Sequence, residues 1–354
     1  MNNYLAQGLT NLYLEVKMKF YDELRKNLLK FNFNKIIGHE DIKKQVKSAL
    51  YARRPIIIVG PPGIGKTTMA RELINILPIK EVNDCGFNCL PESPRCPYCL
   101  TNKQENKKIK TKNINPKELF VRVQGSPDLT AEDLIGDIDP VLAMKHGALS
   151  LEAFTPGKLF KANNGILFFD EINRCSEKLQ NALLQVLEEK KVTVGSYTFD
   201  FDVNFIFIAT MNPEDSSTEP LSDVFMDRFD LIYMSYPENK DEEIKILNSK
   251  NIDYAEFPKE LKDFIVTFIQ ALRESKDLEK HPGVRATLGL YERAQTNALV
   301  NNRKKVVLQD IMDVYLSVMA HRIKLKPSVA YTKSVEEFLQ STLNTLAEKL
   351  TDST

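Results

Sequence analysis

The chain has 354 residues, 43% of them hydrophobic, and its 48 lysines and arginines balance 48 aspartates and glutamates. This length fits about two domains, and the neutral balance excludes the general positive surface of a nucleic-acid coat protein. Because no run of about 18 apolar residues exists and the N-terminus lacks a basic start followed by an apolar stretch, we expect no membrane span, no secretory signal and a cytoplasmic location.

The first predicted element is an amphipathic helix within residues 5–30. Its apolar residues recur at spacings of three and four, at Leu9, Leu12, Val16, Phe20, Leu24 and Leu28. This spacing places them on one face, which we expect to pack on a neighbouring domain or a partner. Residues 1–31 are therefore predicted to form an N-terminal helical extension.

Residues 32–237 alternate short apolar runs with helical patterns. Three runs are continuously apolar, at 56–59, 166–169 and 205–208. Strands of this kind are buried on both faces, as in a parallel sheet covered by helices. The sequence thus predicts an α/β domain over this range.

The first apolar run leads into a glycine-rich loop. The pattern G-x-x-x-x-G-K-T is formed by Gly60, Pro61, Pro62, Gly63, Ile64, Gly65, Lys66 and Thr67, followed by Thr68. Glycines let backbone N–H groups point at phosphate oxygens, and the helix predicted to follow adds its positive end. We expect Lys66 to reach the β- and γ-phosphates of ATP and Thr67 to bind Mg²⁺. A site that binds nucleotide without hydrolysing it is the alternative.

Four of the five cysteines form a cluster, Cys85-x3-Cys89-x6-Cys96-x2-Cys99, within a proline-rich insert at 85–99. Four thiolates on short turns are what a tetrahedral structural Zn²⁺ site needs. Two disulfides are the alternative, which a cytoplasmic location disfavours. The lysine-rich segment 101–117 that follows is expected to be a solvated loop; it has no interleaved aromatic residues that could stack on nucleic-acid bases.

The second apolar run ends in two acids, Asp170 and Glu171. Asp170 can hold Mg²⁺ through water, and Glu171 can polarise the water that attacks the γ-phosphate. Acids at a strand end also serve as N-terminal helix caps, but the presence of Lys66 favours the catalytic interpretation. Cys175 is expected to be an inert packing residue in the helix that follows.

Three elements are predicted after these acids. A β-hairpin within about 190–204 has a two-residue turn at Gly195–Ser196. The β-runs stop after Pro237, and the helical spacing of apolar residues from 261 to 272 indicates a small helical domain over 238–330. A C-terminal helix within 331–354 begins at Ser334, with Glu337 completing a capping box.

Residues 32 to about 325 resemble the AAA+ ATPases, in the helix-2-insert branch that contains the magnesium-chelatase ATPase subunit and the MoxR-like ATPases. The matching motifs, besides the glycine-rich loop, are Ile37–His39, Gln124–Leu129 with Gly136, Pro156–Leu159, Ala162–Gly165, Asp170–Arg174, Ala209–Pro213 and Met226–Phe229. The resemblance implies a P-loop NTPase fold with a central parallel sheet flanked by helices, followed by an all-α lid. It also implies an ATPase that uses ATP and Mg²⁺.

The resemblance assigns further roles. Asn212 is similar to the sensor residue that orients the attacking water with Glu171. Arg228 is similar to the arginine finger, which reaches ATP bound by the neighbouring subunit. Arg285 falls where the lid of this family presents a second phosphate-sensing arginine. A surface salt bridge is the alternative for either arginine.

Two inserts characterise the branch, one at about 137–157 and the hairpin at about 190–204. In related rings they face the centre or the partner, so Lys190, Lys191 and Tyr197 are candidates to touch what the motor moves. An ordinary stabilising hairpin is the alternative. Neither the branch nor the wider family requires a Cys₄ site, which makes the cysteine cluster a departure from the shared core.

The function implied by the resemblance is an ATP-hydrolysing ring, hexameric, that remodels a partner complex. Such rings act with a protein that carries a von Willebrand A domain, which we expect to be a separate chain. Metal insertion into a tetrapyrrole would then occur on another subunit. The alternatives are a nucleic-acid motor related to replicative helicases and a nucleotide-gated scaffold with negligible turnover.

Overall fold

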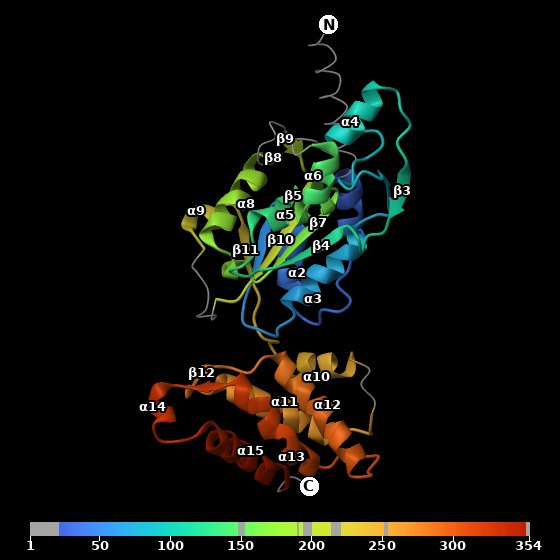
Figure 1. Cartoon of the computed structure of the whole chain (residues 1–354). Helices are drawn as coiled ribbons and strands as arrows, with labels where there is room; N and C mark the ends of the chain where they lie inside the picture. Colours follow the sequence, from blue (N-terminus) through green and yellow to red (C-terminus); the bar gives the residue numbers. More distant parts are fainter. Residues whose placement is uncertain are drawn as a thin grey trace. The chain divides into compact units, whose positions relative to one another are not determined.

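The computed structural model describes residues 21–147, 153–189, 191–193, 200–213, 221–250 and 254–351. The chain divides into two compact units (Figure 1). The first contains the segments up to Asn34, Glu40–Gly60 and Lys66–Tyr233, and the second contains Lys35–His39, Pro61–Gly65 and Met234–Thr354. Two short segments of the N-terminal half therefore belong to the C-terminal unit, and one of them is the glycine-rich loop.

The first unit is built on a five-stranded parallel sheet with the order β11-β1-β10-β7-β4. The strands are β1 Ile56–Val59, β4 Phe120–Gln124, β7 Gly165–Asp170, β10 Phe205–Met211 and β11 Asp230–Tyr233. The three continuously apolar runs are β1, β7 and β10, which occupy the centre. The prediction of buried parallel strands is confirmed.

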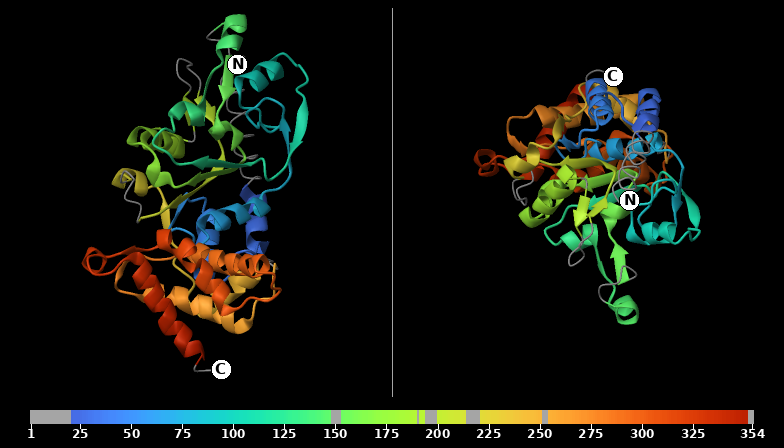
Figure 2. Two further views of the ribbon diagram at one scale, coloured as in Figure 1. Left: turned by 60° about the horizontal axis from the view of Figure 1, so that its bottom comes forward. Right: turned by 90° about the horizontal axis from the view of Figure 1, so that it is seen from above.

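Helices cover both faces of this sheet (Figures 1 and 2). One face is covered by α2 Glu40–Tyr51 and α3 Lys66–Glu72, and α3 continues as a 3₁₀ turn over Leu73–Ile76. The other face is covered by α5 Ala131–Ile135, α7 Lys158–Lys161 and α8 Glu177–Glu189. Ile57 and Val59 share a core with Leu183 of α8. Because side chains alternate along a strand, Ile56 and Ile58 face the opposite layer, so β1 is apolar throughout.

The segment 101–117 differs from the solvated loop expected from its lysines. Its first residues belong to α4 Pro97–Gln104, and its second half contains β3 Thr111–Ile114, which pairs antiparallel with β2 Lys80–Asn83. The prediction was wrong for these two elements because β3 exposes three polar residues in succession and buries only Ile114, so no alternation of apolar and polar residues marks the strand in the sequence.

The predicted insert at 137–157 is described in part. An antiparallel pair, β5 Gly136–Ile138 and β6 Phe154–Pro156, forms its base, and α6 Pro140–His146 projects from it (Figure 2). Met144 of α6 is 91% exposed. Residues 148–152 lie outside the described part.

The hairpin is formed by β8 Lys191–Thr193 and β9 Asp200–Asp202, but its register differs from the prediction. A two-residue turn at Gly195–Ser196 would pair Thr193 with Thr198, whereas Thr193 pairs with Asp200. The preference of glycine for the first turn position did not determine the register of this hairpin. Lys190, the turn and Tyr197 lie outside the described residues.

The second unit contains an all-α core, as expected for the lid. Its helices are α10 Lys240–Asn248, α11 Lys259–Glu274, α12 Val284–Val300, α13 Leu308–Met319, the short α14 Pro327–Ala330 and α15 Val335–Thr351, with a two-stranded ribbon of β12 Leu278–Lys280 and β13 Lys324–Leu325. Leu339 and Leu343 of α15 are buried in this core. The capping box is confirmed, because the Ser334 N–H donates to Glu337 at 2.8 Å and the Glu337 N–H donates to Ser334 Oγ at 3.1 Å.

The predicted N-terminal helix is confirmed in its second part. Residues 21–30 are helical with Leu24 and Leu28 buried, while the earlier part of this helix lies outside the described residues. Cys175 is buried as expected, but it lies in extended backbone between a 3₁₀ turn, Ile172–Arg174, and α8. Of the helices in the described residues, none combines the length and apolarity that a bilayer span requires.

Candidate functional site

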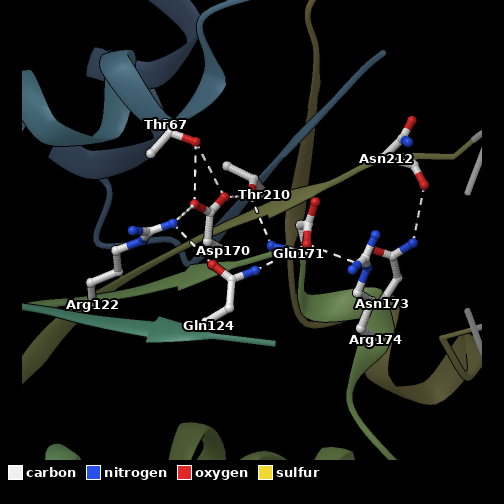
Figure 3. Close-up of polar contacts among 9 residues, drawn as sticks. All are labelled: Thr67, Arg122, Gln124, Asp170, Glu171, Asn173, Arg174, Thr210 and Asn212. Carbon is white, nitrogen blue, oxygen red and sulfur yellow. Dashed lines mark hydrogen bonds and ion pairs between the residues drawn. The ribbon is translucent and has the colours of Figure 1, made fainter. Parts of the chain in front are cut away.

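Asp170 is the last residue of β7, and Glu171 follows it (Figure 3). Glu171 adopts a left-handed backbone conformation, with φ 58° and ψ 54°, and its N–H donates to Thr210 Oγ1 at 3.0 Å. Such a conformation costs a non-glycine residue roughly 1–2 kcal/mol and persists where the surroundings enforce it. Gly125 makes room for this backbone, since a Cβ there would lie 2.0 Å from the Glu171 carbonyl oxygen.

The buried Asp170 carboxylate collects hydrogen-bond donors from three elements (Figure 3). Thr67 of α3 lies 3.2 and 3.3 Å from its two oxygens, and Thr210 of β10 donates to Oδ1 at 2.6 Å. Arg122 of β4 donates to Oδ2 at 2.6 Å. The predicted pair Thr67 and Asp170 is thus brought together, and its hydroxyl and carboxylate oxygens fit the hard ligands that Mg²⁺ prefers.

Glu171 is held at the surface of the same site. Gln124 Nε2 donates to its Oε2 at 3.0 Å, and Arg174 Nε lies 3.3 Å from that oxygen. The Glu171 side chain is 37% exposed, so water reaches the carboxylate. A positioned, solvent-accessible carboxylate can accept a proton from an attacking water.

Asn212 follows β10, next to the acids in sheet order. Asn173 Nδ2 donates to its backbone carbonyl at 3.0 Å (Figure 3). The 3₁₀ turn that follows Glu171 therefore fixes the backbone of the predicted sensor residue relative to the two acids.

The glycine-rich loop Pro61–Gly65 packs on the start of α12 within the second unit. Gly63 and Gly65 have φ values of 81° and 104°, a region that favours glycine. A Cβ at Gly283 would lie 2.4 Å from the Pro62 carbonyl oxygen, and a Cβ at Gly63 would lie 3.3 Å from Cγ of Arg285. The predicted lid arginine thus lies against the loop. Arg285 also lies near a second arginine, Arg322. Burial and the Arg285 guanidinium lower the pKa of Arg322, so an anion bound between these two arginines would relieve their charge repulsion.

A buried ion pair fixes the chain just ahead of Arg285. Arg273 of α11 donates to both carboxylate oxygens of Glu243, at 2.7 and 2.9 Å, and its Nε donates to the Pro282 carbonyl at 2.9 Å. Glu243 is fully buried. Since breaking such a pair costs roughly 3–5 kcal/mol, the segment that leads into α12 is held in one arrangement.

Arg228 lies away from the acids of its own chain. It follows α9 Asp223–Met226 and precedes β11, and its Nε donates to Glu188 of α8 at 2.6 Å. Asp230, two residues later, is three strand spacings, or roughly 14 Å, from β7. The exposed ion pair matches the alternative considered for this arginine and contributes little stability, so it does not hold the side chain firmly.

The contacts of Asp170 and Glu171 include residues to which the sequence gave no role. Arg122, Gln124, Arg174 and Thr210 contact the two acids, and Asn173 holds Asn212. Gln124 and Thr210 could have been found as polar residues at or next to the carboxyl ends of β4 and β10, whereas the contact of Arg122 depends on the register of β4 and β7. Arg174 follows the acids directly, within a motif that was already recognised.

The four clustered cysteines converge on one point. Their Sγ atoms all lie within 4.8 Å of one another. Backbone N–H groups of Arg95 and Cys96 donate to Cys89 Sγ at 3.4 and 3.3 Å, and Asn83 Nδ2 donates to Cys99 Sγ at 3.4 Å. Hydrogen bonds from the neighbouring thiols, Cys89 first, lower the pKa of Cys85. By contrast, burial raises the pKa of Cys175 to about 11, which keeps that thiol neutral and unreactive.

Three segments of the chain match known families. Residues 103–231 match the ATPase family associated with various cellular activities (AAA), residues 271–341 match the AAA lid domain, and residues 32–86 match magnesium chelatase, subunit ChlI. The matches run in order along most of the chain and cover both units.

Individual relatives agree with these matches. The chain is 30% identical to the chaperone MoxR1 of Mycobacterium tuberculosis over 260 residues, covering 64% of this chain and 67% of the relative. It is 27% identical to a magnesium-chelatase subunit ChlI homolog of Methanocaldococcus jannaschii over 337 residues, covering 84% and 86%. A structure of the complex between magnesium-chelatase subunits BchI and BchD is similar at 20% identity and a TM-score of 0.44, covering 87% and 99%. The chain is an ATPase of the AAA+ family, in the branch that contains the magnesium-chelatase ATPase subunit and the MoxR chaperones.

Proposed function

We propose that this ATPase is one subunit of a homo-oligomeric ring, hexameric and cytoplasmic, that remodels or activates a partner protein complex. The observation that carries the proposal is the split arrangement of the catalytic groups. Thr67, Asp170 and Glu171 gather on one edge of the sheet, whereas Arg228 precedes β11, three strands away from β7, and pairs with Glu188 of α8. A finger that cannot serve its own chain can serve the neighbouring subunit in a ring.

In the mechanism, Gly60 to Thr68 hold the phosphates of ATP, with Lys66 at the β- and γ-phosphates. Thr67 and Asp170 hold Mg²⁺, which neutralises phosphate charge when bound. Glu171 accepts the proton of the attacking water, and Asn212 orients that water. Arg285 contributes positive charge from the lid, and Arg228 does so from the neighbouring subunit.

Membership of the branch supports a proposal for the partner. Relatives are named as a chaperone and as a magnesium-chelatase subunit, and we propose that this ring likewise acts on protein, together with a separate von Willebrand A-domain protein. The exposed apolar side chains of α6, Val141 at 62% and Met144 at 91%, support a docking role for the projecting insert.

The test combines ATP turnover with affinity purification from the native host. We expect an A-domain protein to co-purify with the tagged chain, and we expect a single-stranded oligonucleotide of mixed sequence to leave ATP turnover unchanged. Stimulation of turnover by the oligonucleotide, without co-purification of an A-domain protein, would contradict the proposal and favour a nucleic-acid motor.

We further propose that Cys85, Cys89, Cys96 and Cys99 hold one structural Zn²⁺. Four thiolate ligands in a tetrahedron of Zn–S bonds of about 2.3 Å lie about 3.8 Å apart, which the observed cluster accommodates. The N–H groups that donate to the sulfurs would stabilise the thiolates. The convergence of all four sulfurs favours one metal over two separate disulfides.

The zinc proposal predicts about one zinc per purified chain. Cys96→Ser removes one of the four thiolate ligands and is expected to lose most of the metal on dialysis against a chelator, with a lower melting temperature. Cys175→Ser is the matched control, because Cys175 is buried outside the cluster, and it is expected to retain the zinc. Elemental analysis distinguishes the two, and equal zinc content in both variants would disprove the assignment.

A further inference from the structure

Arg122 forms an ion pair with the buried acid of the candidate site. Its Nη2 lies 2.6 Å from Asp170 Oδ2, and the same nitrogen donates to Gln124 Oε1 at 2.9 Å. Figure 3 shows the guanidinium beside the carboxylate, on the far side from Glu171. Nothing in the proposed mechanism uses this cation.

The register of the sheet explains why Arg122 reaches Asp170. Strands β4 and β7 are parallel, with Arg122 opposite Phe168 and Gln124 opposite Asp170. Residues two apart on a strand share a face, so Arg122 and Gln124 lie on the same side of the sheet. The long arginine side chain extends along the strand and meets the acid on the diagonal.

The Asp170 carboxylate has few free positions left to accept a further hydrogen bond or to bind a cation. Oδ1 accepts from Thr210 at 2.6 Å, Thr67 lies within 3.3 Å of both oxygens, and Arg122 occupies Oδ2. A carboxylate offers about four lone-pair positions, so a divalent cation that uses Asp170 must share these positions with the guanidinium. Two positive groups at one carboxylate also repel each other.

The two members of the ion pair differ in their freedom to move. The Asp170 side chain is 10% exposed, whereas that of Arg122 is 43% exposed. A partly exposed arginine can exchange its partner for water at a small cost, but the buried carboxylate is held by two threonines. When the ion pair breaks, Arg122 is therefore expected to move away while Asp170 stays in place.

We propose that Arg122 is a displaceable internal cation that competes with Mg²⁺ for Asp170 and sets the Mg²⁺ concentration at which the site fills. The inference rests on the proposed role of Asp170 as a metal-holding residue. It adds a function for a residue outside the recognised catalytic set: the arginine makes metal binding weaker than the oxygen ligands alone would allow.

The test measures binding of Mn²⁺, as a paramagnetic probe for Mg²⁺, to the full chain in the presence of ADP. Arg122→Gln is expected to bind Mn²⁺ about three- to tenfold more tightly than the wild type, because a competing ion pair is removed. Arg122→Lys keeps the charge without the planar fork and is expected to fall between the two. Free Mn²⁺ is followed by electron paramagnetic resonance, and thermal melting confirms that each variant is folded.

Arg54→Gln is the matched control. Arg54 also pairs with an aspartate of the sheet, Asp230 at 3.0 Å, but at the amino end of β11. This variant is expected to bind Mn²⁺ as the wild type does.

Unchanged or weaker Mn²⁺ binding by Arg122→Gln, with normal binding by the wild type, would overturn the competition and leave the proposed function standing. Weaker binding would show that Arg122 positions Asp170 for the metal. Failure of the wild type itself to bind Mn²⁺ with ADP would overturn the metal-holding role of Asp170, and the competition with it.

Discussion

Glu171→Gln is expected to abolish ATP hydrolysis while ATP binding is retained. The substitution keeps the size of the side chain and its ability to accept from Gln124, but an amide cannot take the proton of the attacking water. Removal of a general base lowers rates by about 10²–10⁴-fold. Turnover is measured by phosphate release, and binding by the fluorescence of a labelled ATP analogue.

Glu177→Gln provides the control for this loss of charge. Glu177 is an exposed residue at the start of α8, six positions after Glu171. It is expected to hydrolyse ATP at the wild-type rate. If Glu171→Gln also turned over normally, the proton would be accepted elsewhere and the catalytic assignment would be wrong.

Arg228→Ala is expected to lower ATP turnover about a thousandfold or more, the usual contribution of an arginine finger. Its exposed ion pair with Glu188 contributes little stability, so the folded state should hardly change. The loss should therefore appear in turnover and leave the melting temperature within a few degrees.

Arg54→Ala is the control for this second prediction. It removes a comparable surface pair with Asp230, only two residues after Arg228. Turnover close to that of the wild type is expected. A similar loss in both variants would mean that the edge of the sheet, and not the finger, had been damaged.

The parts of the fold that depend on local sequence patterns could be predicted from the sequence alone. The strands β1, β7 and β10 could be predicted because burial on both faces requires continuous apolar runs. The pairing of Thr67 with Asp170 followed as well, since a loop and an acid at the carboxyl ends of parallel strands meet at one edge.

Contacts that depend on register could not be predicted. Arg122 reaches Asp170 only because β4 and β7 align Gln124 with Asp170, and no local pattern states which strands are neighbours. The same limitation explains the hairpin, where the pairing of Thr193 with Asp200 contradicts the expected turn. The strand β3 was missed because three of its four residues are exposed and polar and the segment around it is rich in lysine, a pattern that suggests a loop.

The two proposed phosphate-sensing arginines could be found in the sequence, but their contacts could not. Motifs located Arg228 and Arg285 in the sequence, but only the structure shows that Arg285 lies against the glycine-rich loop and that Arg228 pairs with Glu188. Whether an arginine completes the site of its own chain or of a neighbour is a property of the assembly, which a motif does not encode.

The most direct test of a site shared between subunits is ATP turnover by rings assembled from two inactive variants. Arg228→Ala subunits keep Glu171, and Glu171→Gln subunits keep Arg228, so about a quarter of the interfaces in a random equimolar ring combine both intact residues. Turnover at about that fraction of the wild-type rate is predicted, after the variants are mixed and allowed to exchange subunits. Mixed rings as inactive as either parent would contradict the account, because they would place Arg228 in the site of its own chain.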